Sequence, residues 1–294
     1  MMLVMLVFWP VLSYDFVYWD DGVSVTHNPT LKGPWSWDLV KSFFDPQTAF
    51  RFKPLHWMVL RLVSDVGEMN PAVWHAFGLG LHAVASAGVF MALRKALCIG
   101  VGTRGDTLVA GVAWMAAAIW ALHPLRAVPV AWVTGSSYPM TTVFIAWSYW
   151  AYLNAYAMDA GQKSGGRWLM VALLLAVAAY ATYPISVTYV AWLMATDKCL
   201  LRRVPAQPWL MASEDVRRWW SKHIAFAVPT IIAVGATLWT RLVAPAGWYV
   251  APSLGEVSWL ERLATGKATL MMFPLKLIWP VHLTPNHAHR TVPA

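Results

Sequence analysis

Two adjacent acids near the start of the chain are the residues best placed to do chemistry. Asp20 and Asp21 follow Tyr18 and Trp19 just past the first apolar segment, and an irregular polar stretch comes next. A carboxylate there can accept a proton from an attacking hydroxyl, or hold a divalent cation against a phosphate. The alternative is an acidic aqueous loop without a chemical role, and the residue types alone leave both interpretations open.

Cationic and aromatic side chains recur in segments that we expect on the same membrane face as the acids. These residues are Arg51, Lys53, His123, Arg126 and Trp132. The cations among them can bind phosphate oxygens through charge-assisted hydrogen bonds, with ordinary headgroup contact as the alternative. Trp132 suits an interfacial anchor or a platform for stacking a sugar. Acids and cations together suit a substrate that has an anionic phosphate and a hydroxyl to be activated.

Two groups of histidines give weaker signals. His75 and His82 are seven residues apart and therefore share a helix face, where hydrogen bonding inside the bundle is the simplest interpretation. His282, His287 and His289 near the end match no standard metal-site spacing. The sequence also contains no Walker loop, Rossmann glycine pattern, nucleophile elbow or paired Cys-x-x-Cys.

The composition is that of a membrane protein. The chain is 59% hydrophobic and 12% charged, with a mean hydropathy of +0.50, which does not suit a soluble globular domain. The 20 Trp and 10 Tyr suit many membrane–water boundaries. The net charge of +8 lies mostly in short loops between spans and therefore does not indicate a nucleic-acid partner. Cys98 and Cys199 fall at predicted cytoplasmic helix ends, where we expect reduced thiols.

The apolar pattern predicts an all-α, polytopic transmembrane helix bundle of about seven spans. The predicted spans are residues 1–14, 71–97, 106–122, 138–157, 167–180, 184–201 and 221–243. Short interfacial helices are expected at 35–44 and 54–68, in the first extracytoplasmic loop. The stretch 265–283 carries two lysines and two prolines, so it is either a last span or a re-entrant or interfacial helix.

Basic residues predict the orientation of this bundle. They concentrate in three alternate loops, at residues 94–104, 163–167 and 198–222. The positive-inside rule makes these loops cytoplasmic. The Asp20 loop, the His123 loop, the Tyr183 turn and residues 244–262 then share the extracytoplasmic side with every candidate reactive residue.

Five short motifs, in the same order along the chain, resemble those of C-type (GT-C) membrane glycosyltransferases. They are Tyr18-Trp19-Asp20-Asp21 with Val25-Thr26-His27-Asn28-Pro29; Arg51-Phe52-Lys53-Pro54-Leu55; Trp74-His75 with Gly80-Leu81-His82; Ala121-Leu122-His123-Pro124-Leu125-Arg126 with Val130-Ala131-Trp132-Val133; and Pro280-Val281-His282-Leu283-Thr284-Pro285. Within that family, the chain resembles the branch that usually carries tetratricopeptide repeats. That branch includes the transmembrane O-mannosyltransferases acting on cadherins, but these residues carry no repeat signature.

The resemblance implies one GT-C-like transmembrane domain over residues 1–294, truncated at its C-terminus relative to the family. It implies a hexosyltransferase that moves a sugar from a polyprenyl-phosphate-linked donor to a protein or glycan acceptor. The reaction would take place on the extracytoplasmic side of a bacterial inner membrane or an endoplasmic reticulum membrane. Asp20 or Asp21 would be the general base, with Asp20 favoured by position, or the pair would hold Mg²⁺ or Mn²⁺. Arg51, Arg126 and His123 would face the donor phosphate.

Two departures from the family pattern support a second interpretation. The family usually has an Arg and an Asp a few positions after the motif that ends at Val133, but this chain has neither in residues 134–139. Tyr183 stands where the family usually has a Lys. The alternative is therefore a catalytically degenerate, structural subunit of a membrane complex. A transporter or lipid-handling protein is disfavoured, because the spans lack matched Gly/Pro breaks in two halves.

Overall fold

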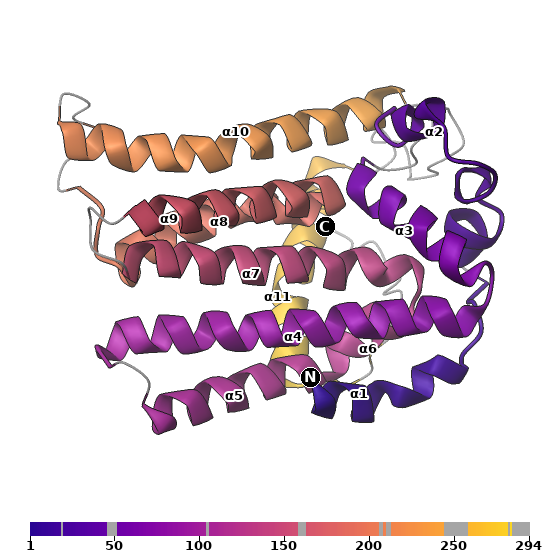
Figure 1. Cartoon of the computed structure of the whole chain (residues 1–294), viewed down its shortest axis with the longest axis horizontal. Coiled ribbons are helices and arrows are strands. Elements are labelled where there is room, and N and C mark those ends of the chain that lie inside the picture. The colour runs from indigo at the N-terminus through magenta and orange to yellow at the C-terminus, as the bar shows by residue number, and fades with distance from the viewer. Residues whose placement is uncertain are drawn as a thin grey trace.

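The described residues form helices joined by turns and irregular segments. The computed structural model describes residues 1–18, 20–45, 52–103, 106–157, 163–205, 208–209, 213–243, 258–281 and 283. Every regular element in these ranges is helical (Figure 1), which confirms the predicted all-α class. Three of the described helices are long and apolar enough to cross a membrane. They are α4 (Pro71–Val101), α8 (Lys163–Thr182) and α10 (Glu214–Val243).

A fourth candidate span exists only if two helical segments that are separated by a bend are counted as one span. Helix α5 (Thr107–Leu122) and the segment Pro124–Ala131, which contains η4 (Pro124–Arg126) and α6 (Ala127–Ala131), meet at a bend of 56°. The sequence predicts this break at His123-Pro124, because proline cannot continue the preceding helix. The described helices thus support a membrane protein with three or four candidate spans, and the predicted count of about seven stays a prediction.

Local structure explains why the other apolar stretches fall short as spans. Residues 184–201 begin as a 3₁₀ segment, η6 (Pro184–Thr188), which leaves only 11 residues for α9 (Tyr189–Cys199). At 1.5 Å per residue, α9 is about 17 Å long, well below the thickness of a bilayer core of about 30 Å. Similarly, α1 (Met2–Phe8) gives way to a 3₁₀ segment, η1 (Trp9–Ser13). Helix α7 (Ser137–Ala157) is long enough but rich in Tyr, Ser and Thr.

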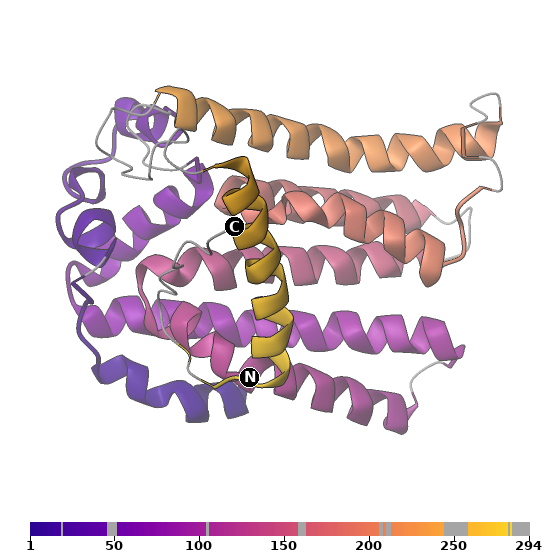
Figure 2. The same cartoon turned by 180° about the vertical axis from the view of Figure 1, so that it is seen from behind.

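The long helices lie side by side, and the chain reverses direction from each long helix to the next one in the sequence, so the neighbours α4 and α7 run in the same direction (Figures 1 and 2). The C-terminal ends of α4, α7 and α9 therefore gather at one end of the bundle, with the predicted basic loops. The small helices α2 (Trp37–Ser42) and α3 (Pro54–Gly67) cover the opposite end. Helix α11 (Trp259–Ile278) crosses the other helices transversely on one face (Figure 2). Its axis therefore runs across the long helices and not alongside them.

Small residues allow the central helices to approach closely. Ala172, Ala176 and Ala179 on α8 are fully buried, and α8 packs mainly against α7. On α4, a Cβ atom added to Gly88 would lie 2.9 Å from Nε1 of Trp147 on α7. Such contacts are typical of helices that pack in lipid, where van der Waals fit replaces the hydrophobic drive. The sequence of the α4–α7 interface therefore sets how close these two helices come.

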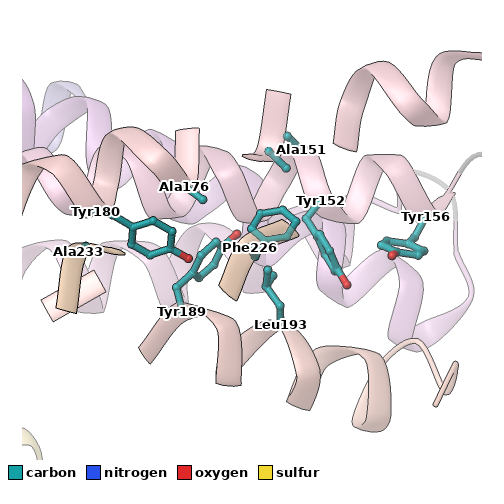
Figure 3. Packing of buried hydrophobic residues seen from close by; sticks show 10 residues of the cluster. Ala151, Tyr152, Tyr156, Ala176, Tyr180, Tyr189, Leu193, Phe226 and Ala233 are labelled. Carbon is teal, nitrogen blue, oxygen red and sulfur yellow. The ribbon is translucent and has the colours of Figure 1, made fainter. Parts of the chain in front are cut away.

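Aromatic rings fill the space between α7, α8, α9 and α10 (Figure 3). Phe226 lies between two of them, with ring centroids 6.0 Å from Tyr152 and 6.3 Å from Tyr189. Buried phenols need partners. The Tyr189 hydroxyl donates to Ser148 at 3.0 Å, and the Tyr152 hydroxyl donates to Asp197 at 2.8 Å.

A buried acid ties three helices together near the basic end. Asp197 on α9 is fully buried and accepts hydrogen bonds from Tyr152 on α7 and from Nε1 of Trp219 on α10, the latter at 2.9 Å. Nε2 of His223 lies 3.7 Å from the same carboxylate. Because a buried carboxylate needs such donors, this cluster favours one relative placement of the three helices.

At the other end, a second apolar cluster fixes the loop that carries the acids. Its buried members are Val25, Leu31, Phe43, Trp57, Leu60, Trp74 and Val133. Pro54 at the first position of α3 and the Asn70 side chain, which accepts from Ala72 N at 3.1 Å, define where α3 and α4 begin. Both starts were expected from the sequence, and they bring residues 20–45 onto the ends of the long helices.

Candidate functional site

The two adjacent acids have different surroundings. Asp21 is fully buried, and its carboxylate oxygens accept three hydrogen bonds. Oδ1 accepts from the backbone N–H and the hydroxyl of Thr134, at 2.9 and 2.6 Å. Oδ2 accepts from Val17 N at 3.1 Å. Asp21 therefore joins the first loop to the segment between α6 and α7, and it is not among the residues that line the cavity beside Asp20.

Asp20 lines a small cavity at the end of the bundle away from the basic connections. The cavity has a volume of about 20 Å³, roughly enough for one water molecule. Its walls come from the first loop, the start of α3 and the turn before α7. The lining residues are Asp20, Ser24, Lys53, Trp132, Thr134, Ser137, Tyr138 and Tyr183. A half-buried carboxylate and a cation thus border the same space.

The cation in this cavity comes from the first turn of α3. Lys53, at the N-cap of α3, is 4% exposed, and its ammonium lies 4.6 Å above the centre of the Trp57 ring. His56 follows one turn later, and its Nε2 is 3.1 Å from the hydroxyl of Ser136. Burial, reinforced by the positive charge of Lys53, holds the pKa of His56 well below its usual value. His56 is therefore neutral at pH 7, which keeps Lys53 as the main positive charge here.

Two of the residues predicted to bind the donor phosphate, His123 and Arg126, do not line the cavity with Lys53. The Arg126 guanidinium lies over the ring of Trp120, 5.2 Å from its centre. Nε2 of His123 is 2.9 Å from the Leu277 carbonyl oxygen of α11, and Nδ1 of the same ring accepts from Leu125 N at 3.2 Å. Neither side chain lines the cavity. The prediction for Arg51 falls outside the described residues.

Trp132 does line the cavity, together with hydroxyl residues that the sequence analysis missed. Its ring packs against Gly135, where an added Cβ atom would lie 3.1 Å from the ring. Ser24, Thr134, Ser137 and Tyr138 complete the walls. The run of hydroxyl residues at 134–138 was noted only as a departure from the family pattern. Its position at the start of a predicted span was the signal that could have identified it.

The predicted Mg²⁺ or Mn²⁺ site would rest mainly on Asp20. Such ions are commonly held by one or two carboxylates together with waters and substrate phosphates. Both oxygens of Asp21 already accept hydrogen bonds, and the neighbouring acid shares its cavity with an ammonium group. Within the described ranges, no group of three or more His, Cys, Asp or Glu side chains is placed to hold a metal. A divalent cation held by Asp20 and the donor phosphate stays a prediction.

The paired histidines of α4 have the structural role that the sequence favours. Nε2 of His82 is 2.9 Å from the Ala121 carbonyl oxygen, and Nε2 of His75 is 3.5 Å from that of Asp15. These contacts attach α4 to α5 and to the first loop. The histidines predicted near the C-terminus, His282, His287 and His289, lie outside the described residues.

A second, larger cavity adjoins the first. It has a volume of about 380 Å³, within the usual range of small-molecule sites. Its lining residues are Phe52, Tyr138, Tyr183, Pro184, Ile185, Thr237 and Thr240. Tyr138 and Tyr183 border both cavities.

Comparison with protein-family models, with curated proteins and with solved structures finds no match to this chain.

Proposed function

We propose that this protein is a membrane glycosyltransferase. It moves a sugar from a polyprenyl-phosphate-linked donor to a protein or glycan acceptor on the extracytoplasmic side. The observation that carries the proposal is the shared cavity, where Asp20, Lys53 and Trp132 meet although they are far apart in the sequence. Sugar transfer from a phosphate uses a base, a cation and an aromatic face, and the sugar and phosphate would bind at the opening of this cavity, which itself has room for about one water molecule.

The transfer step uses these groups in defined roles. The acceptor hydroxyl oxygen attacks the anomeric carbon, and its proton passes to the Asp20 carboxylate. The new bond joins the acceptor oxygen to the sugar, while the bond between the sugar and the phosphate oxygen breaks. The lipid phosphate leaves with the bonding electron pair and gains negative charge. The Lys53 ammonium stabilises that charge, and burial strengthens the interaction.

The location of the cavity supports an extracytoplasmic active face. The predicted basic loops lie at the other end of the bundle (Figure 1), and such loops usually remain in the cytoplasm. We propose that the full bundle has about seven spans. It would lie in a bacterial inner membrane or an endoplasmic reticulum membrane. Membrane lipids would surround it.

The first test of this function is a transfer assay with purified protein in liposomes. Polyprenyl-phosphate hexoses and a range of peptide and glycan acceptors would be supplied. Loss of a general base typically costs 10²- to 10⁴-fold, so Asp20→Asn should lower kcat by at least about 100-fold. The matched control is Asp38→Asn on α2, whose side chain is 92% exposed, and it should transfer sugar at the wild-type rate. Equal rates for wild type and Asp20→Asn would refute the proposed role.

A specific observation favours the alternative, a structural subunit without catalysis. Lys53 is the one predicted donor-side cation that is described as lining the cavity, since Arg126 stacks on Trp120 and Tyr183 carries no charge. If wild type transfers no sugar with any donor and co-purifies with a stable membrane partner, the subunit interpretation replaces the enzyme.

A further inference from the structure

The larger cavity is apolar along most of its wall. Thr237 and Thr240 of α10 line it, but their hydroxyls donate within their own helix, to Ala233 O at 2.7 Å and to Thr237 O at 2.7 Å. Their methyl groups therefore complete a surface formed by Phe52, Pro184 and Ile185. A ligand in this cavity would contact mainly carbon.

The polar groups of this wall lie at its junction with the small cavity. Tyr138 is in the first turn of α7, and Tyr183 precedes η6. Their rings pack edge to face with centroids 5.1 Å apart, and their hydroxyl oxygens are 3.5 Å apart. This tyrosine pair separates an apolar chamber from a cavity that contains an ammonium group.

We propose that the larger cavity binds the isoprenoid segment next to the donor phosphate, and that the tyrosine pair marks the boundary between lipid and phosphate. The two cavities share Tyr138 and Tyr183, so a ligand that reaches both would place an apolar part against the larger one and an anionic group near Lys53. The cavity is also bordered by α10, whose exposed face carries large apolar side chains such as Ile231, Ile232 and Leu238. A lipid chain can therefore pass from the bilayer along α10 into the cavity. This inference rests on the proposed function and names where its donor lipid lies.

Binding measurements test this placement without requiring transfer. The probes are a soluble C15 isoprenyl phosphate and inorganic phosphate, each titrated into the full chain in detergent by calorimetry. Wild type should bind the isoprenyl phosphate at least tenfold more tightly than inorganic phosphate. Ile185→Trp and Thr237→Trp fill the cavity and should each weaken isoprenyl-phosphate binding at least tenfold. Ile224→Trp, at an exposed position on α10 more than three turns from Thr237, is the matched control and should bind as wild type does.

Cross-linking gives a second readout that does not depend on folding of a variant. An isoprenyl phosphate with a diazirine on its first isoprene unit should label peptides containing residues 183–185 and 237–240 in wild type. Labelling elsewhere, or affinities of the two Trp variants within twofold of wild type, would overturn the proposal. Failure of sugar transfer together with the expected binding and labelling would instead refute the proposed function and keep the lipid site.

Discussion

At the scale of single residues, adjacent acids differ because their side chains point in different directions. Asp21 has helical backbone angles, φ −65° and ψ −30°, and successive side chains on such a backbone diverge by about 100°. One carboxylate therefore points into the protein and holds Thr134, while the other borders the cavity. The proposed division is that Asp21 positions the segment at 134–138 and Asp20 does the chemistry.

This division predicts that two similar substitutions differ in how much they destabilise the fold. Asp21→Asn removes the charge from three buried hydrogen bonds and should lower the free energy of unfolding by about 2 kcal/mol. Asp20→Asn alters a half-buried group and should change stability by less than about 0.5 kcal/mol. Denaturation in detergent, followed by tryptophan fluorescence, measures both. Equal destabilisation by the two variants would contradict the division.

A second prediction concerns pH and His56. The pKa of the buried ring is lowered in the folded protein by burial and by Lys53, so the unfolded chain binds a proton more readily. The contribution of His56 to stability is therefore complete above its usual pKa of about 6.5 and is lost as pH falls below it. The slope is at most about 1.4 kcal/mol per pH unit. His56→Gln should be less sensitive between pH 7 and pH 5, as measured by denaturation; identical pH profiles would rule out this linkage.

At the scale of elements, the close contact between α4 and α7 depends on one glycine. Gly88 faces Trp147 and Ala146, and an added Cβ atom would lie 2.9 and 3.1 Å from their nearest atoms. Gly80 on the same helix has nothing within 4 Å of the equivalent position. The two glycines therefore form a matched pair for testing the packing.

Overpacking at such a contact usually costs about 1–3 kcal/mol. Gly88→Val should lower the free energy of unfolding by that amount, because the α4–α7 contact must widen. Gly80→Val should be neutral or slightly stabilising, since valine is a better helix former than glycine. Thermal unfolding in detergent compares the two variants. If both behave alike, the helices do not pack as described.

Elements that have clear end signals were predictable from the sequence, and others were not. Pro54 and Asn70-Pro71 correctly predicted the starts of α3 and α4. Hydropathy could not distinguish the 3₁₀ segment at Pro184–Thr188 from an α-helix, so the sequence overestimated the length of α9. Charge identified Asp20 and Lys53 as candidates, whereas uncharged Ser137 and Tyr138 gave no comparable signal. The stacking of Arg126 on Trp120 depends on the bend after α5, which a linear pattern does not specify.

At the scale of the whole molecule, the account requires the acidic end and the basic end to face opposite sides of a membrane. Cys199, at the basic end, is exposed in the structure, and so is Lys41 on α2 at the acidic end. The two positions can therefore report on the two sides.

Labelling with a membrane-impermeant maleimide tests this orientation in intact cells. Lys41→Cys, in a Cys98→Ser and Cys199→Ser background, should react at once. The chain that keeps Cys199 alone should react only after the membrane is permeabilised. The opposite pattern would place the Asp20 cavity in the cytoplasm and remove the basis for extracytoplasmic transfer.

The most direct test is the initial rate of sugar release from the lipid-phosphate donor, measured per folded molecule for wild type and Asp20→Asn side by side. The account predicts that the variant keeps its fold and its affinity for donor but loses at least about 99% of the rate. A variant that releases and transfers sugar as fast as wild type would contradict the claim that the Asp20–Lys53 cavity is where the sugar moves.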